Sequence, residues 1–229
     1  MHKITITKNH GESILDFFLA LTSGLLLTAA YPKLDWGILA WIALVPLLCA
    51  IRDKSYKSAF KLGFIAGGIH YLTLLYWISG VMNTYGRLPA PVSWGILLLL
   101  VSYLSLYPAA FCTLFAGLKN RYPQWIWITP FLWVGFEYLR SLFLSGFPWE
   151  NLGYAQYNLL PLIQISDIFG VYGLSALIVA TNLMLFETGW AVYTKQTVPW
   201  KSVLIVVCLM AICFAYGIWR FREVSTLVQ

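Results

Sequence analysis

The sequence predicts an all-α integral membrane protein, a bundle of about seven transmembrane helices. Of its 229 residues, 60% are hydrophobic and only 10% are charged, whereas soluble domains carry roughly 25% charged residues. The mean hydropathy is +0.74. So few charges cannot cover a globular surface. The 11 tryptophans and 14 tyrosines are also typical of a chain that meets two membrane–water interfaces.

Seven apolar segments approach the roughly 20 residues that a spanning helix needs. They are residues 14–30, 36–51, 62–81, 92–118, 125–144, 159–186 and 203–219. The second segment is short and contains Pro46, so we expect it to be kinked or incomplete. The sixth is too long for one span, and we expect residues 159–168 to lie at the interface, or to re-enter the membrane, before the true span begins.

The basic residues predict the orientation of these spans. With the N-terminus inside, ten Lys and Arg residues fall on the cytoplasmic side and four outside, and Arg140 lies within a span. Because basic residues accumulate in cytoplasmic loops, we expect a cytoplasmic N-terminus and a periplasmic C-terminus. The net charge of +6 has the same origin, since no basic run is long enough to track a nucleic acid. The first segment, which ends in LTAA, also resembles a cleaved signal peptide.

Charged residues within the predicted spans are costly and need a reason. Glu137 and Arg140 lie three residues apart in the sequence FEYLRS, so a helix places them on one face. We predict either that they form an ion pair that fixes two helices together, or that Arg140 binds the phosphate of a lipid headgroup. No second metal-ligating residue lies at a suitable spacing from His70, and all four cysteines lie in apolar segments. We therefore predict no metal site and no cofactor.

The stretch SGFPWENLGYAQYN, residues 145–158, is unusually aromatic for a connector between spans. Pro148 disfavours helical geometry at Phe147, so the chain must turn there. An aromatic belt accounts for the rings individually, but not for the Glu, Asn and Gln residues among them. Aromatic walls with a few polar groups are typical of a pocket for an amphiphile. The predicted lipid-access loop consists of Phe147, Pro148, Trp149, Gly153, Tyr154 and Gln156, supported by Glu137 and Arg140.

These motifs together resemble the membrane domain of the apolipoprotein N-acyltransferase family. The stretch 145–158 is similar to the family's GFPW-x-x-x-GY-x-Q loop, and FEYLRSLFL to its E-x-x-R helix. AAYPKLDWGILAWIALVPLL resembles its first loop and second helix, and YGRLPAPVSWGILLLLVSYLSLYPAAF its third loop and fourth helix. The resemblance implies a polytopic domain over residues 1–221. It also implies that residues 222–229 are a stub of a periplasmic nitrilase-like domain.

The family transfers an acyl chain from a phospholipid to the N-terminal diacylglyceryl-cysteine of lipoproteins, using a Glu–Lys–Cys triad in the nitrilase-like domain. No residue here matches that triad, so we predict no catalytic residue in this chain and no activity of the chain alone. The implied location is the bacterial inner membrane. The implied partners are the bilayer, phospholipid, the lipid-modified lipoprotein N-terminus and a nitrilase-like domain encoded separately. The alternatives are a non-catalytic lipid-binding scaffold, half of a two-chain enzyme and a small transporter.

Overall fold

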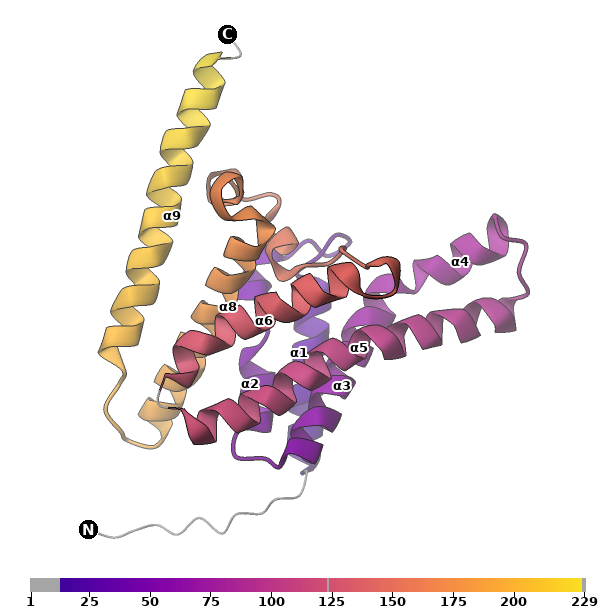
Figure 1. The fold of residues 1–229 in the computed structure, drawn as a ribbon, viewed down its shortest axis with the longest axis horizontal. Coiled ribbons are helices and arrows are strands. Elements are labelled where there is room, and N and C mark those ends of the chain that lie inside the picture. Colours follow the sequence, from indigo (N-terminus) through magenta and orange to yellow (C-terminus); the bar gives the residue numbers. More distant parts are fainter. Residues whose placement is uncertain (1–12, 123, 228–229) are drawn as a thin grey trace.

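The computed structural model describes residues 13–122 and 124–227, and within these ranges every regular element is a helix. Figure 1 shows their arrangement. The α-helices are α1 (Ile14–Ala29), α2 (Val45–Ile51), α3 (Tyr56–Leu75), α4 (Trp77–Thr84), α5 (Ala90–Arg121), α6 (Trp125–Leu142), α7 (Leu160–Ile163), α8 (Ser166–Tyr193) and α9 (Trp200–Leu227). Three short 3₁₀ helices lie between them: η1 (Gly37–Trp41), η2 (Phe143–Ser145) and η3 (Leu152–Gln156).

Four helices of the described ranges are long and apolar enough to cross a membrane, namely Tyr56–Leu75, Ala90–Lys119, Ser166–Tyr193 and Trp200–Glu223. The predicted count of about seven spans is not confirmed. Helix α1 has 16 residues and reaches only about 24 Å, less than the roughly 30 Å thickness of a hydrocarbon core. Helix α9 continues past residue 221, where the sequence placed a domain boundary, and reaches Leu227.

The second predicted segment is interrupted, as Pro46 suggested. It divides into η1 and the seven-residue α2, with Pro46 in the first turn of α2. Asn182 on α8 binds both sides of the break: its side-chain oxygen accepts from the Leu44 N–H at 2.9 Å, and its amide donates to the Ala40 carbonyl at 2.9 Å. The Ser23 hydroxyl donates to the Ala43 carbonyl at 2.6 Å. These bonds satisfy backbone groups that a broken helix would otherwise leave unpaired in an apolar surrounding.

The sixth predicted segment also divides. Residues 160–163 form α7, and α8 begins at Ser166 but bends at Gly170, whose φ is +62°. The continuous part of α8 therefore starts close to the predicted end of the interfacial piece. Asp167 makes no capping hydrogen bond to α8. Its carboxylate instead accepts from the Tyr216 hydroxyl at 2.7 Å and from Arg220 Nε at 3.1 Å, which ties α8 to α9.

Helices α3 and α5 pack closely because two glycines of α3 face α5. A Cβ on Gly63 would lie 2.6 Å from the Pro108 carbonyl oxygen, and one on Gly67 would lie 3.1 Å from Ser105 Cα. Small residues at such a crossing let two backbones approach. Pro108 does not end α5, which runs through it for 32 residues. The main buried core lies around this crossing and extends to α1, α2, α6 and α8.

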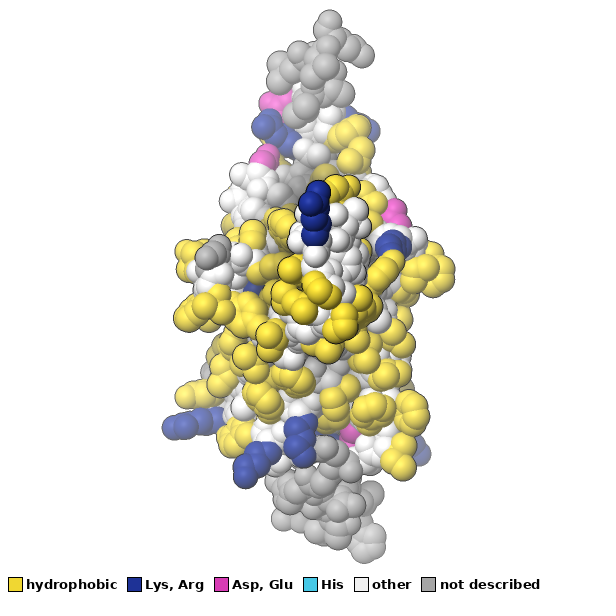
Figure 2. Space-filling view, turned by 90° about the vertical axis from the view of Figure 1, so that its right-hand side faces the viewer, with side chains coloured by type: hydrophobic (Ala, Val, Ile, Leu, Met, Phe, Trp, Pro, Cys, Tyr) yellow, Lys and Arg dark blue, Asp and Glu magenta, His cyan; other side chains and the backbone are white. Residues whose placement is uncertain are grey.

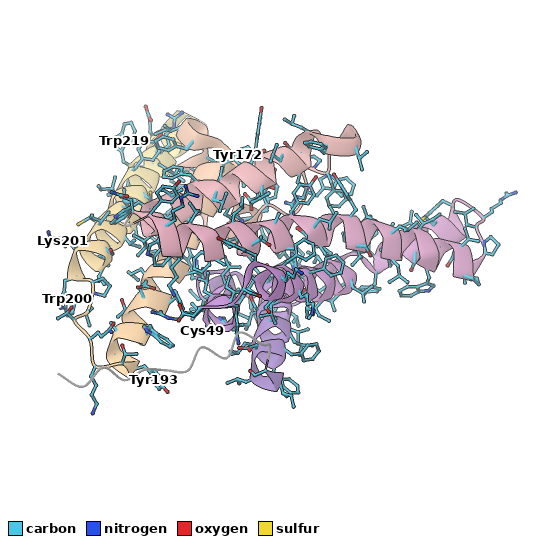
Figure 3. The ribbon with its side chains drawn as sticks, turned by 60° about the horizontal axis from the view of Figure 1, so that its bottom comes forward. Cys49, Tyr172, Tyr193, Trp200, Lys201 and Trp219 are labelled. Carbon is cyan, nitrogen blue, oxygen red and sulfur yellow. The ribbon has the colours of Figure 1, made fainter. Side chains whose placement is uncertain are left out.

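Most of the loops lie at two ends of the bundle, while the α4–α5 turn projects to one side (Figure 1). The basic end carries loops 52–55 and 194–199 and the C-terminus of α5, and the loop end carries residues 30–36 and 143–159. Hydrophobic side chains cover the band between, with Lys and Arg toward its lower and upper ends (Figure 2). In Figure 3, Tyr193 and Trp200 lie at one end of the α8–α9 pair and Trp219 and Tyr172 at the other. Trp200 and Trp219 are about 29 Å apart along α9, which matches the thickness of the hydrocarbon core of a bilayer.

Candidate functional site at the loop end

The chain leaves α6 through a turn that only glycine fits. Helix α6 ends at Leu142, and Gly146 adopts a φ of +81°. A Cβ there would overlap the Ser141 carbonyl oxygen, so any other residue would force the turn to shift. Residues 147–151 are not helical, as Pro148 predicted. The Phe147 N–H donates to the Arg140 carbonyl at 2.8 Å, which fixes the start of the loop against the end of α6.

Arg140 of α6 holds loop 143–159 in place through hydrogen bonds. Its side chain is buried, and its guanidinium donates to the Tyr71 hydroxyl, to the Trp149 carbonyl at 3.0 Å and to the side-chain oxygen of Asn151 at 2.8 Å. The planar guanidinium is suited to binding several acceptors in fixed directions. One side chain of α6 thus fixes the loop on both sides of Glu150 and joins it to α3.

Glu137 and Arg140 lie on the same buried face of α6, but the expected ion pair is not found among the described residues. Glu137 Oε1 accepts from Trp133 Nε1 at 2.9 Å and from the Leu152 N–H at 2.6 Å. Arg140 uses its N–H groups on other acceptors. The helical spacing predicted the shared face correctly. It could not show that the following loop would fold back and supply partners to both charges.

The six predicted loop residues fall into three groups by exposure. Phe147 is half-buried against α3 and α5, and its ring meets Trp149 edge to face at 5.4 Å. Pro148, Trp149 and Tyr154 are exposed. Gly153 and Gln156 are buried and hold η3 in place: the Gly153 N–H donates to the Ser175 hydroxyl at 2.9 Å. Phe147, Trp149 and Tyr154 do not line the groove or the cavity described below.

Gln156 joins the two loops of this end. Its side-chain oxygen accepts from Trp41 Nε1 at 3.0 Å, and its amide donates to the Gly37 carbonyl at 2.7 Å. Nearby, the Asn158 amide donates to Asp35 at 2.7 Å. Two of the polar residues interleaved with the aromatics, Gln156 and Asn158, are therefore occupied by bonds to η1 and loop 30–36, which is a structural role.

A groove of about 580 Å³ opens beside the loop, between α1 and α3. It is lined by Thr28, Tyr31, Pro32, Lys33, Leu34, Thr73, Leu74, Trp77 and Glu150. The sequence did not predict these residues as a site, although loop 30–36 lies in the AAYPKLDW motif that resembles the family's first loop. Its walls are mostly apolar, with the Thr28 and Thr73 hydroxyls bonded to each other at 2.8 Å. The Thr28 hydroxyl also lies 3.2 Å from His70 Nδ1, so His70 is hydrogen-bonded within the helix bundle.

A second, smaller cavity of about 30 Å³ adjoins the groove, around Arg140, His70 and Tyr71. Its volume is enough for about one water molecule. Glu150 lines both spaces. Burial raises the pKa of the Glu150 carboxyl to about 7, although the nearby Arg140 charge lowers it. The described residues contain no group of three His, Cys, Asp or Glu side chains placed to hold a metal ion.

Comparison with known proteins agrees with this architecture. A family profile described as "Apolipoprotein N-acyltransferase N-terminal domain" matches residues 23–184. An apolipoprotein N-acyltransferase of Geobacter metallireducens is 46% identical over 90% of this chain and 40% of its own length. Those of Photobacterium profundum and Rickettsia prowazekii are 29% and 32% identical, over 92% and 80% of this chain. The chain spans about 40% of the length of these relatives. It belongs to the apolipoprotein N-acyltransferase family and matches that family's N-terminal domain.

Proposed function

We propose that this chain is the membrane part of an apolipoprotein N-acyltransferase. The acyl chain would pass from a phospholipid to the N-terminal amine of a lipid-modified lipoprotein. In this role the loop end faces the periplasm and brings lipid to a nitrilase-like domain, because no residue of this chain matches the family's triad. Membership of the family supports the proposal. The observation that carries it is the groove between α1 and α3.

The groove has the size and chemistry of a lipid site. Its volume of about 580 Å³ lies within the range of small-molecule pockets, roughly 300 to 1,000 Å³. Pro32, Leu34, Leu74 and Trp77 supply apolar walls for an acyl chain. The Lys33 ammonium, which lies 3.9 Å from the centre of the Tyr76 ring, is suited to a lipid phosphate as a compact point charge.

The exposed rings of the predicted loop belong to the same proposal. Trp149 and Tyr154 are 56% and 47% exposed, and amphipathic rings of this kind favour the membrane interface. They would keep the loop at the level of the lipid headgroups. Phe147, Pro148, Gly153 and Gln156 would hold that loop in shape rather than touch lipid.

The proposal includes a location and an orientation, and the distribution of basic residues supports the orientation. We place the chain in the bacterial inner membrane with the basic end in the cytoplasm. The α2–α3 loop and the C-terminal end of α5 lie at that end (Figure 1). They carry Arg52, Lys54 and Lys119, and the positive-inside rule favours basic residues on the cytoplasmic side. The loop end and the C-terminal end of α9 then lie on the periplasmic side.

Photolabelling tests the lipid groove. The chain is reconstituted with phosphatidylcholine that carries a photoreactive acyl chain, and the labelled residues are mapped by mass spectrometry. We expect labelling at Leu34, Leu74 and Trp77 to exceed that at Trp200 and Trp219, which are exposed on α9. Leu74→Trp should reduce the groove labelling by filling the space, whereas Leu204→Trp on α9 should not. Equal labelling of the groove and of α9 would show only general contact with the bilayer.

A further inference from the structure

Glu150 is held in a strained backbone conformation by contacts from two sides. Its φ is +63°, a region that non-glycine residues occupy only at a cost of about 1 kcal/mol or more. The Tyr31 hydroxyl lies 3.0 Å from both the Glu150 and the Asn151 carbonyl oxygens. Arg140 binds the Trp149 carbonyl and the Asn151 side chain. The residues on either side are therefore fixed, and Glu150 is turned toward the groove.

The carboxylate of Glu150 has no cation bound to it among the described residues. Its Oε2 atom is buried without a hydrogen-bond partner, and the side chain lines the groove. The guanidinium of Arg140 donates elsewhere, to Tyr71, Trp149 and Asn151. Lys33 lines the same groove, but its ammonium lies over the Tyr76 ring. A half-buried acid without a bound cation is costly, which indicates a ligand that supplies one.

The groove beside Glu150 indicates which kind of ligand would supply a positively charged group. Pro32, Leu34, Leu74 and Trp77 offer a wall for a hydrocarbon chain, and Glu150 is the only carboxylate among the residues that line the groove. We propose that Glu150 binds the primary ammonium group of a lipid whose hydrocarbon chain lies in the α1–α3 groove, an inference that rests on the proposed function. Two molecules share this chemistry: an aminophospholipid, through its headgroup, and a lipid-modified peptide, through its N-terminal amine.

The proposal predicts a defined pH window. Burial raises the pKa of Glu150 to about 7, so ammonium binding should weaken as the pH falls through 7 and the carboxyl becomes protonated. The other charged and titratable groups that share the cavity or the groove with Glu150 are Tyr31, Lys33, His70, Tyr71, Glu137 and Arg140. The upper limit depends on the ligand. A peptide α-amine loses its proton near pH 8, and a primary alkylamine such as that of lysine only near pH 10.

The test compares lipids that differ only in the ammonium group. The full chain in nanodiscs is photolabelled at pH 7.5 with phosphatidylethanolamine or phosphatidylcholine of the same photoreactive acyl chain. Only the first has N–H donors. Hydrogen bonds to charged groups are stronger than those between neutral groups, so we expect groove labelling by phosphatidylethanolamine to be at least about tenfold stronger. Glu150→Gln should remove this preference, whereas Asp35→Asn, which removes a neighbouring carboxylate outside the groove, should keep it.

A second arm separates the two sources. A photoreactive diacylglyceryl-cysteine peptide is compared with its N-acetylated form at pH 7.5 and pH 9. A peptide ligand should label only with a free amine and lose labelling at pH 9, while an aminophospholipid should keep it. If the wild-type groove is labelled equally by phosphatidylethanolamine and phosphatidylcholine, and equally by the free and the N-acetylated peptide, the ammonium site is overturned. The proposal of an acyl-chain groove would survive that result. Absence of groove labelling by any probe would overturn the proposed lipid function as well.

Discussion

The Tyr31 hydroxyl lies 3.0 Å from the Glu150 carbonyl oxygen and joins two loops that are 119 residues apart in sequence. We predict that Tyr31→Phe loosens this junction. Hydrogen bonds of this kind contribute about 1 kcal/mol each, so the midpoint of thermal unfolding in detergent should fall by about 2–4 °C. Tyr85→Phe is the control, since Tyr85 is 83% exposed. The same small change in both variants would mean that Tyr31 does not hold the loop.

Arg140 should matter far more to stability than an exposed arginine. Its side chain is 3% exposed and holds Tyr71, Trp149 and Asn151. Arg140→Ala leaves these three acceptors unpaired, two of them in buried side chains, and should cost about 3 kcal/mol or more. Arg87→Ala, at an exposed position in the α4–α5 turn, should cost less than about 0.5 kcal/mol. Chemical unfolding in mixed micelles measures both, and comparable losses would contradict this role of Arg140.

A glycine at the α3–α5 crossing and an unpacked glycine of α4 should respond in opposite ways to substitution by alanine. Gly63→Ala places a methyl group 2.6 Å from the Pro108 carbonyl oxygen, so it should lower stability by about 1–3 kcal/mol through overpacking. Gly80→Ala in α4 meets nothing within 4 Å and should be neutral or stabilising, because alanine favours helix. Thermal stability monitored by size-exclusion chromatography distinguishes them. A neutral Gly63→Ala would show that the crossing is looser than described.

Orientation in the membrane is open to a direct test. We predict that reporters inserted in loop 52–55 and fused after Leu227 lie on opposite sides of the membrane, with the first in the cytoplasm. The basic residues of that loop and the position of the α9 C-terminus at the other end favour this. Alkaline phosphatase and fluorescent-protein fusions at both sites give the answer. Activity of the same reporter at both sites would rule the topology out.

The sequence predicted the features that depend on local patterns. Apolar length predicted helices, Pro46 predicted the interruption between η1 and α2, and Pro148 predicted the turn after α6. The count of spans was not confirmed, because composition does not show whether a 16-residue helix such as α1 crosses a bilayer. The expected Glu137–Arg140 ion pair was not found in the part of the chain that the structure describes, because Trp133, Asn151 and the Leu152 N–H supply hydrogen-bond partners to the two side chains instead. A lipid-binding role for Phe147, Trp149 and Tyr154 stays a prediction. Tyr31 and Lys33, which meet Glu150 at the groove, are more than 115 residues from it, and no local pattern relates them.

A chimera with a relative tests the central proposal most directly. Residues 1–227 of this chain would replace the matching part of the Geobacter metallireducens apolipoprotein N-acyltransferase, which is 46% identical to it. Acylation of a diacylated lipoprotein is then measured by mass spectrometry in membranes, with the relative's own enzyme and this chain alone as references. The account predicts transfer by the chimera and none by this chain alone. A chimera that folds and inserts but transfers no acyl chain, while the relative's enzyme does, would contradict it.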